Sequence, residues 1–554
     1  MGSDWYNFDF LRMGHVLKRV LSVICLAIGS MAIIGGLQSA AAEDGPAKAA
    51  NSGARCQALT GLHLAGVEVT GARLVPAAPA GTVPFNPVTQ NMIPVAMPEY
   101  CRVEGVINRR KGAEGVEYGI GFALALPNNW NGRLMFQGGG AFNGSIRQPF
   151  GNACNPRDPA LAQGFAVIST DSGHKGEPFD TTFMRDQQAA LDFAFNAVSA
   201  VSRLGKELVT AYFGRAPHHT YSAGCSTGGR EGMLAAQRYP ALFDGIISGD
   251  PAIRSAYTRI AGWNATIAFN RIAPRDVQGN PLRIQAFPAE DQKLLHAAVA
   301  EQCDGLDGLK DGLILNLAAC KFDPAVLQCE KEKNAGCLSA EQVTALKTAF
   351  GGPRDGEGNP LYTGFPYDLG LLGEHPDSPM NILPASVPGI YDNPPSPFTF
   401  DFAPEIARIR ADPVQILSDT KDWTDLGSFY RRGGKIIFYH GAADPWFSIY
   451  DTLDYFQRNK EANPEFDSSR FYSVPNMGHC GDGGMEVFDM LTPLIDWVEN
   501  GKTPGAIVAT DWLRTGTTRP LCPWPQYGRY KGAGDPKDAA NFECRSDLPA
   551  VAIP

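Results

Sequence analysis

The residues His219-Thr220-Tyr221-Ser222-Ala223 are typical of a buried strand, and Gly224-Cys225-Ser226-Thr227-Gly228 follows them directly. The second run has the pattern G-x-S-x-G, and residues 228–239 after it show helical spacing. Between a strand and a helix, this pattern indicates a sharp turn that exposes a serine oxygen. Ser226 is therefore predicted to be a nucleophile. The backbone N–H of Thr227, at the start of the helix, is predicted to face an oxyanion.

Strands and helices alternate on both sides of this turn. Short apolar runs predict strands at 134–137, 165–169, 219–223, 245–249, 435–440 and 470–474, and residues 186–213 show helical spacing. Such alternation predicts the α/β class, with a parallel sheet covered by helices on both faces. The rhythm stops over residues 255–425, which we interpret as an inserted lid domain. The core then has a first part, 43–254, and a second part, 426–554.

Two further loops carry chemistry. Asp444 follows the predicted strand 435–440, and His479 follows the predicted strand 470–474. A carboxylate after a late strand can orient a histidine, which can then act as a general base. The chain order Ser226, Asp444, His479 is that of α/β-hydrolases. Asp451 and Asp454 are alternative acids, although both lie in a predicted helix.

Cysteines flank two of these residues. Cys225 directly precedes Ser226, and Cys480 directly follows His479. If the serine and the histidine come within hydrogen-bonding distance, their neighbouring cysteines come close as well. We therefore expect a disulfide between Cys225 and Cys480 that joins the two catalytic loops.

The N-terminus has the layout of a secretory signal peptide. Lys18 and Arg19 precede an apolar stretch over 20–37, and small residues follow it. We interpret residues 1–42 as a cleaved signal, with Met13 as a possible start. The alternative is an uncleaved membrane anchor. The prediction is an exported protein, periplasmic or secreted, that has no membrane contact after cleavage.

The composition agrees with export and excludes one class of partner. Of the 12 cysteines, 11 remain after Cys25 in the signal is removed, and such a number implies disulfides with at least one thiol unpaired. The net charge is −10, from 48 Lys and Arg against 58 Asp and Glu, and no basic run appears. Because phosphate binding needs clustered Lys and Arg, we do not expect a nucleic-acid partner.

Three motifs together resemble the tannase and feruloyl esterase family: Cys225-Ser226, Asp444-Pro445 and Gly478-His479-Cys480. The resemblance implies an α/β-hydrolase fold with a large inserted lid. It also implies a serine esterase that acts on aromatic-acid esters through an acyl-enzyme. Cys225–Cys480 would be the family disulfide beside the triad. The other pairs that it implies, with Cys154 left free, are Cys56–Cys101, Cys303–Cys320, Cys329–Cys337 and Cys522–Cys544.

The resemblance also implies a structural Ca²⁺ in the lid. The acidic loop 304–313 carries three carboxylates, and two backbone carbonyls would complete a set of oxygen ligands. These predicted ligands are Asp304, Asp307, Leu309, Asp311 and Leu313. The alternative is a solvated acidic turn. No cofactor is expected for catalysis.

The second oxyanion donor is expected from Gly138-Gly139-Gly140, after the predicted strand 134–137. We favour Gly140, although the loop continues to Gly144 and leaves the choice among the glycines open.

Phe447, beside the acid, is predicted to stack on an aromatic acyl ring, with core packing as its alternative role. The expected partner is a small aromatic ester, and Thr227 after the nucleophile resembles the feruloyl esterases of the family. A feruloyl-esterase-like enzyme is therefore favoured. The alternative within the family is a hydrolase of terephthalate monoesters. Outside it, the alternatives are a secreted serine peptidase and an inactive polyphenol-binding protein.

Overall fold

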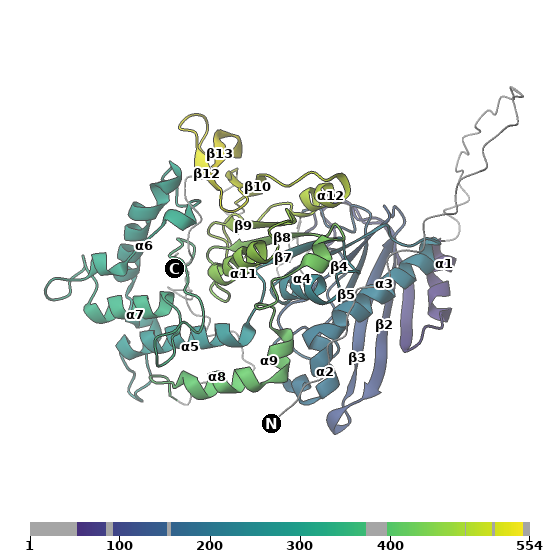
Figure 1. Ribbon diagram of the computed structural model, residues 1–554, viewed down its shortest axis with the longest axis horizontal. Coiled ribbons are helices and arrows are strands. Elements are labelled where there is room, and N and C mark those ends of the chain that lie inside the picture. Colours follow the sequence, from purple (N-terminus) through teal and green to yellow (C-terminus); the bar gives the residue numbers. More distant parts are fainter. Residues whose placement is uncertain are drawn as a thin grey trace, which may run out of the picture. The chain divides into compact units, whose positions relative to one another are not determined.

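The structure is a computed structural model that describes residues 52–84, 92–151, 157–372, 396–481, 483–511 and 516–546 (Figure 1). The predicted signal peptide and Cys154 lie outside these residues. The main element is a nine-stranded sheet with the order β1-β2-β3-β5-β4-β6-β7-β8-β9. In the described part of the chain, no helix has the length and apolar character needed to cross a membrane.

Six strands form the parallel part of the sheet, and all six predicted strands are confirmed to within two residues. They are β4 (Arg133–Gln137), β5 (Ala166–Thr170), β6 (His219–Cys225), β7 (Gly245–Gly249), β8 (Lys435–Gly441) and β9 (Ser469–Val474). Every residue of β5 and β7 is buried. Strands covered on both faces are apolar throughout, which explains why these runs could be recognised.

The prediction of an entirely parallel sheet is wrong at one edge. There β1 (Val67–Val75), β2 (Tyr100–Lys111) and β3 (Glu117–Pro127) pair antiparallel with one another, and β3 pairs antiparallel with β5. In β1 exposed polar residues alternate with partly buried ones, and β2 carries several charged residues. In β3, by contrast, Phe122–Leu126 is a continuous buried apolar run, which the sequence analysis did not select.

Helices cover both faces of the sheet. On one face lie α3 (Ala197–Phe213), α4 (Thr227–Arg238) and α11 (Ile449–Ala462), whose apolar residues share one core cluster with the sheet. On the other face lies α12 (Leu491–Asn500), in a second cluster. The predicted helix 186–213 is divided, because α2 (Gln187–Leu191) and a π-helical segment (Asp192–Asn196) precede α3. A short helix, α1 (Ser52–Ala58), is tied to β2 by the Cys56–Cys101 disulfide.

The described residues between β7 and β8 form helices and loops, and none of these residues adds a strand to the main sheet. In Figure 1 the helices α5 to α8 lie together to one side of the sheet, and most of them share a core cluster of their own. Two of the predicted disulfides, Cys303–Cys320 and Cys329–Cys337, are in this part. The helices are α5 (Ser255–Ile272), α6 (Ala289–Cys303), α7 (Ala340–Phe350), α8 (Phe402–Ala411), α9 (Pro413–Ser418) and α10 (Gly427–Tyr430).

The C-terminal part forms two small antiparallel sheets. One pairs β10 (Ile507–Thr510) with β11 (Thr518–Leu521), and the other pairs β12 (Tyr527–Tyr530) with β13 (Phe542–Arg545). The predicted Cys522–Cys544 disulfide joins them. The buried Arg519 in β11 pairs with Asp311, so this region is anchored to the acidic loop of the insertion.

Candidate active site

Ser226 occupies the sharp turn between β6 and α4. Its backbone has φ 62° and ψ −123°, a combination that residues other than glycine rarely adopt. Two backbone hydrogen bonds fix the turn to the end of β7 and the loop after it. Ser226 N donates to Gly249 O at 3.0 Å, and Ser226 O accepts from Ala252 N at 3.1 Å. The serine side chain is thus presented at the carboxyl edge of the sheet, as the G-x-S-x-G pattern predicted.

The glycines around this turn allow three backbone segments to touch. A Cβ atom on Gly224 would lie 2.6 Å from the carbonyl carbon of Gly228, and one on Gly228 would lie 2.9 Å from that of Gly138. No side chain fits in either gap. The nucleophile turn, the start of α4 and the loop after β4 are therefore in direct backbone contact.

Asp444 and His479 form the expected acid–histidine pair. His479 Nδ1 lies 2.7 Å from Asp444 Oδ2, and Asp444 is fully enclosed. The other oxygen, Oδ1, accepts from the backbone N–H groups of Trp446 at 2.8 Å and Phe447 at 3.0 Å. Burial acts to raise the pKa of Asp444, but the charge of His479 and hydrogen bonds from His440 and His479 outweigh it and hold the pKa below its usual range.

The alternative acids have other partners. Asp451 forms ion pairs with Arg254 and Lys421, and Asp454 pairs with Lys421 and Arg458. Their carboxylates therefore hold the insertion and α11 together, whereas Asp444 is the carboxylate that bonds to His479.

The second ring nitrogen of His479, Nε2, is available to accept or donate a hydrogen bond. Nε2 is buried and has no hydrogen bond to any described residue, Ser226 Oγ included. The disulfide between Cys225 and Cys480 sets the Cα atoms of those two residues 5.8 Å apart. Ser226 and His479 are each the chain neighbour of one of these cysteines. A catalytic hydrogen bond is often long before substrate binds, so this arrangement suits a serine–histidine pair.

The loop after β9 reaches the nucleophile by crossing the end of β8. A Cβ atom on Gly441 would lie 2.3 Å from the carbonyl oxygen of Met477, so glycine is required at the crossing point. Ala443 N also donates to that oxygen, at 3.0 Å. The acid loop and the histidine loop are thereby fixed to each other.

The backbone amides of the loop after β4 differ in their hydrogen-bond partners. Gly138 N, Gly139 N and Gly140 N donate to Ala223 O, Glu231 Oε2 and Asn143 Oδ1, respectively, over 2.8–3.1 Å. The expected donor, Gly140, is thus engaged within its own loop. Ala141 follows with φ 51°, and its N–H donates to no described residue.

Thr227 links the two sides of this region. Its N–H belongs to the first turn of α4, and its hydroxyl donates to the carbonyl oxygen of Ala141. The predicted donor after the nucleophile is therefore held directly against the loop that carries the unused amide.

Comparisons with known proteins agree with this geometry. The sequence profile "Tannase and feruloyl esterase" matches residues 101–381 and 399–545. The chain is 38% identical over 515 residues to "Mono(2-hydroxyethyl) terephthalate hydrolase" from Piscinibacter sakaiensis, with 81% of this chain and 85% of that protein covered. The chain belongs to the tannase and feruloyl esterase family. It is accordingly a carboxylic ester hydrolase.

Two solved structures share the fold of this family member. Feruloyl esterase B from Aspergillus oryzae aligns with a TM-score of 0.70 at 24% identity, over 89% of this chain and all of that one. Tannin acyl hydrolase from Aspergillus niger aligns with a TM-score of 0.65 at 22% identity, over 87% of this chain and 92% of that one. The α/β-hydrolase fold is thereby confirmed.

Aromatic rings surround His479 in this esterase. The ring centroids of Trp446 and Phe447 lie 4.8 and 5.3 Å from that of His479. The predicted Phe447 is 5% exposed, whereas Trp446 is partly exposed and contacts Phe179 edge to face at 6.3 Å. The Phe447 ring is thus buried beside the His479 ring. Trp446 and Phe179, which the sequence analysis did not select, are the rings with free surface.

The acidic loop of the insertion lies against the histidine loop. Asn476 Nδ2 donates to Gly312 O at 2.8 Å, three residues before His479. Within the loop, Asp304 accepts from the N–H groups of Gly312 and Leu313. Burial, together with the charges of Asp311 and Asp304, raises the pKa of Asp307 to about 7. Asp311 also pairs with Arg519, so these carboxylates already have protein partners, and the predicted Ca²⁺ site stays a prediction.

The Cys225–Cys480 disulfide closes a loop of 255 residues. We predict that Cys225→Ala/Cys480→Ala lowers the free energy of unfolding by about 2–5 kcal/mol. It should also reduce kcat/KM for an aromatic ester about tenfold or more, because the serine and histidine lose their shared tether. Chemical denaturation and steady-state kinetics measure both effects.

The matched control is Cys329→Ala/Cys337→Ala, which removes a disulfide that spans only 8 residues in the insertion. It should leave kcat/KM near the wild-type value. Equal loss of activity in both double variants would contradict the tethering role.

Proposed function

We propose that this esterase is an exported serine hydrolase of aromatic-acid esters, with Ser226, His479 and Asp444 as its catalytic triad. One observation carries the proposal. His479 is bonded to a buried carboxylate through Nδ1, while its unpartnered Nε2 lies on the loop that a disulfide joins to the nucleophile turn.

The mechanism follows from these positions. His479 Nε2 takes the proton of Ser226 Oγ, and the oxygen attacks the ester carbonyl. His479 then protonates the leaving alcohol, and an acyl-enzyme remains. Water, deprotonated by the same histidine, hydrolyses the acyl-enzyme and restores Ser226. Asp444 holds the ring with Nδ1 protonated and stabilises the imidazolium.

The oxyanion of each tetrahedral intermediate needs two donors. Thr227 N is one, at the positive end of α4. We assign the other to Ala141 N in place of Gly140 N, because Gly140 already donates to Asn143. Each such donor stabilises the transition state by about 3 kcal/mol.

The substrate class rests on the aromatic surface and on the relatives. Trp446 and Phe179 provide ring faces beside His479 that suit an aromatic acyl group. We favour hydroxycinnamate or gallate esters. A terephthalate monoester is the second candidate, which the 38% identity to the Piscinibacter sakaiensis hydrolase favours. Methyl ferulate, methyl gallate and mono(2-hydroxyethyl) terephthalate distinguish these classes by kcat/KM.

Two features outside the triad complete the proposal. Five disulfides support residence in an oxidising compartment after export by the predicted signal over 1–42. A structural Ca²⁺ would be held by Asp304, Asp307 and Asp311 with the carbonyls of Leu309 and Leu313. It would neutralise the acidic loop and take no part in the chemistry.

Ser226→Ala is predicted to lower kcat about 10⁴-fold or more, because no other group replaces the nucleophile. Labelling of the wild-type protein by a fluorophosphonate should map to Ser226. The control is Ser222→Ala in the same strand, whose buried hydroxyl has no partner in the described structure. Turnover by a pure Ser226→Ala preparation would disprove the mechanism.

Trp446→Ala is predicted to raise KM for methyl ferulate several-fold, up to about tenfold, since one aromatic contact contributes about 0.5–1.5 kcal/mol. The KM for ethyl acetate, which has no ring, should change little. Trp423→Ala is the control, because that ring is 48% exposed on the insertion. An equal change for both esters would show that Trp446 does not contact the acyl ring.

Removal of Ca²⁺ with a chelator is predicted to lower both the melting temperature and kcat, because the acidic loop supports the histidine loop through Asn476. Addition of Ca²⁺ should restore both. Asp307→Asn should abolish the response to Ca²⁺. An unchanged melting temperature and activity after complete chelation would argue against the ion.

A further inference from the structure

A second buried carboxylate lies beneath the catalytic loops. Asp250 directly follows β7, the strand that separates the nucleophile strand β6 from the acid strand β8. Its side chain is fully buried, and its backbone has a positive φ of 34°. A buried carboxylate is costly unless it is well bonded, so its contacts indicate what it does.

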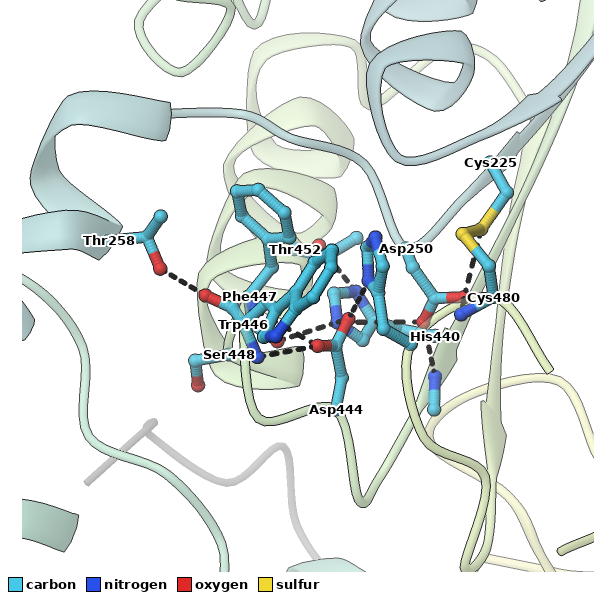
Figure 2. A network of polar contacts seen from close by, with 12 residues as sticks. Cys225, Asp250, Thr258, His440, Asp444, Trp446, Phe447, Ser448, Thr452 and Cys480 are labelled. Atoms are coloured by element: carbon cyan, nitrogen blue, oxygen red, sulfur yellow. Dashed lines mark hydrogen bonds and ion pairs between the residues drawn. A yellow bond between two sulfur atoms is a disulfide. The ribbon is translucent and has the colours of Figure 1, made fainter. Parts of the chain in front are cut away.

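The Asp250 carboxylate contacts all three catalytic loops (Figure 2). Oδ1 accepts from Gly441 N at 2.7 Å, at the start of the acid loop. Oδ2 accepts from Cys480 N at 3.2 Å, next to His479. The same oxygen lies 3.2 Å from the sulfur of Cys225, which precedes Ser226 and carries no proton in the disulfide.

A second buried histidine connects Asp250 to the catalytic acid. His440 Nε2 lies 3.4 Å from Asp444 Oδ2 and 3.7 Å from Asp250 Oδ1. It also bonds to Phe447 O at 2.9 Å, and Nδ1 lies 2.9 Å from Thr452 Oγ1. His440 thus lies close to both carboxylates, and its charge acts to lower the pKa of each.

We propose that Asp250 is a positioning residue for the triad: its carboxylate sets the three loops in register and stabilises the imidazolium of His479 from beneath. The proposal rests on the triad assigned above. Asp250 touches neither substrate nor reacting atoms, so it acts through His479 and the disulfide.

The electrostatics agree with this role. The titratable groups that face Asp250 are His440 and Asp444, from β8 and the loop after it, and His479, from the loop after β9. Burial raises the pKa of Asp250 to about 6, with Asp444 adding to the rise and the two histidines opposing it. The hydrogen bonds from Gly441 N and Cys480 N and the charges of the two histidines favour the anionic form of Asp250. Burial acts to lower the pKa of His479, but the charges of Asp444 and Asp250 outweigh it and the pKa is raised.

The sign of the pH effect follows. His479 must be neutral to accept the serine proton, so activity falls as the pH drops through its pKa. Asp250→Asn removes a negative charge that favours the imidazolium. The pKa of His479 should therefore fall, and the acid limb of kcat/KM should move to lower pH by about half a unit or more. The value of kcat at its optimum should drop about tenfold, with little change in KM.

The matched control is Asp171→Asn. Asp171 is buried, accepts two backbone N–H groups, from Gly121 and Gly173, and has its pKa raised to about 6 by burial. The groups that shift its pKa include no member of the triad. This variant tests the loss of a buried charge elsewhere, and its acid limb should coincide with that of the wild type.

The outcomes are separable. A folded Asp250→Asn protein with an unmoved acid limb overturns the proposal, as does an equal shift in Asp171→Asn. If Asp250→Asn does not fold, the test uses Asp250→Glu, which retains the negative charge, and the same acid limb of kcat/KM is measured. A folded Asp250→Glu with the wild-type limb supports the role, whereas a shifted limb or an unfolded protein makes Asp250 a folding residue only. Failure of the triad itself would appear in Ser226→Ala, independently of these profiles.

Discussion

The active site depends on the loop after β9, which crosses the ends of two strands to bring His479 near Ser226. The proposed nucleophile Ser226 follows β6, and His479 lies in the loop after β9, with β7 and β8 between these two strands. Three strand spacings amount to about 14 Å, yet the Cα atoms of Cys225 and Cys480 are 5.8 Å apart. The loop after β9 must therefore fold back over the ends of two strands. The disulfide makes this return covalent, and every catalytic contact that we propose assumes it.

The ends of β7 and β8, which this loop crosses, each carry a residue that accommodates or binds the loop. Gly441, at the end of β8, leaves room for the carbonyl of Met477. Asp250, at the end of β7, accepts an N–H from the loop and another from Gly441. The cost of burying a carboxylate is offset by these bonds and by the neighbouring histidines. Backbone contact, hydrogen bonding and charge thus all act on the same few loop residues.

How far the sequence predicted this site depends on how local each signal is. Ser226, Asp444 and His479 each lie in the turn or loop that follows a predicted strand, so chain order and position after a strand were enough to select them as candidates. Their adjacent cysteines then predicted the disulfide. The choice among the amides of the loop after β4 stayed open, because the sequence does not show that Gly140 N donates to the side chain of Asn143.

The roles of the aromatic and charged residues around the site could not be assigned from the sequence, for a related reason. Phe447 and Trp446 are adjacent, and only the folded loop shows which ring is covered. Asp250 reads as an ordinary Asp-Pro turn, and His440 as one polar residue inside an apolar strand. Their roles arise from contacts with residues about 190 or more positions away or on neighbouring loops, which no local pattern records. Of the antiparallel edge strands, β1 was missed because alternation with exposed residues weakens its apolar signal.

The insertion is hydrogen-bonded to the loop that holds Asp444. Thr258 in α5 donates to the carbonyl of Trp446, Tyr362 OH accepts from Ser448 N at 3.1 Å, and Ser448 Oγ donates to Gly364 O. The loop that holds Asp444 also carries the partly exposed ring of Trp446. Three hydrogen bonds join this loop to the insertion.

On the other side, Asn476 fastens the histidine loop to the acidic loop, and Arg519 fastens that loop to the C-terminal sheets. Any change in the insertion that moves these anchors moves Asp444 or His479 with them. If Trp446 contacts the acyl group as we propose, selectivity is tied to the geometry of the acid–histidine pair, because the same short loop carries Trp446 and Asp444.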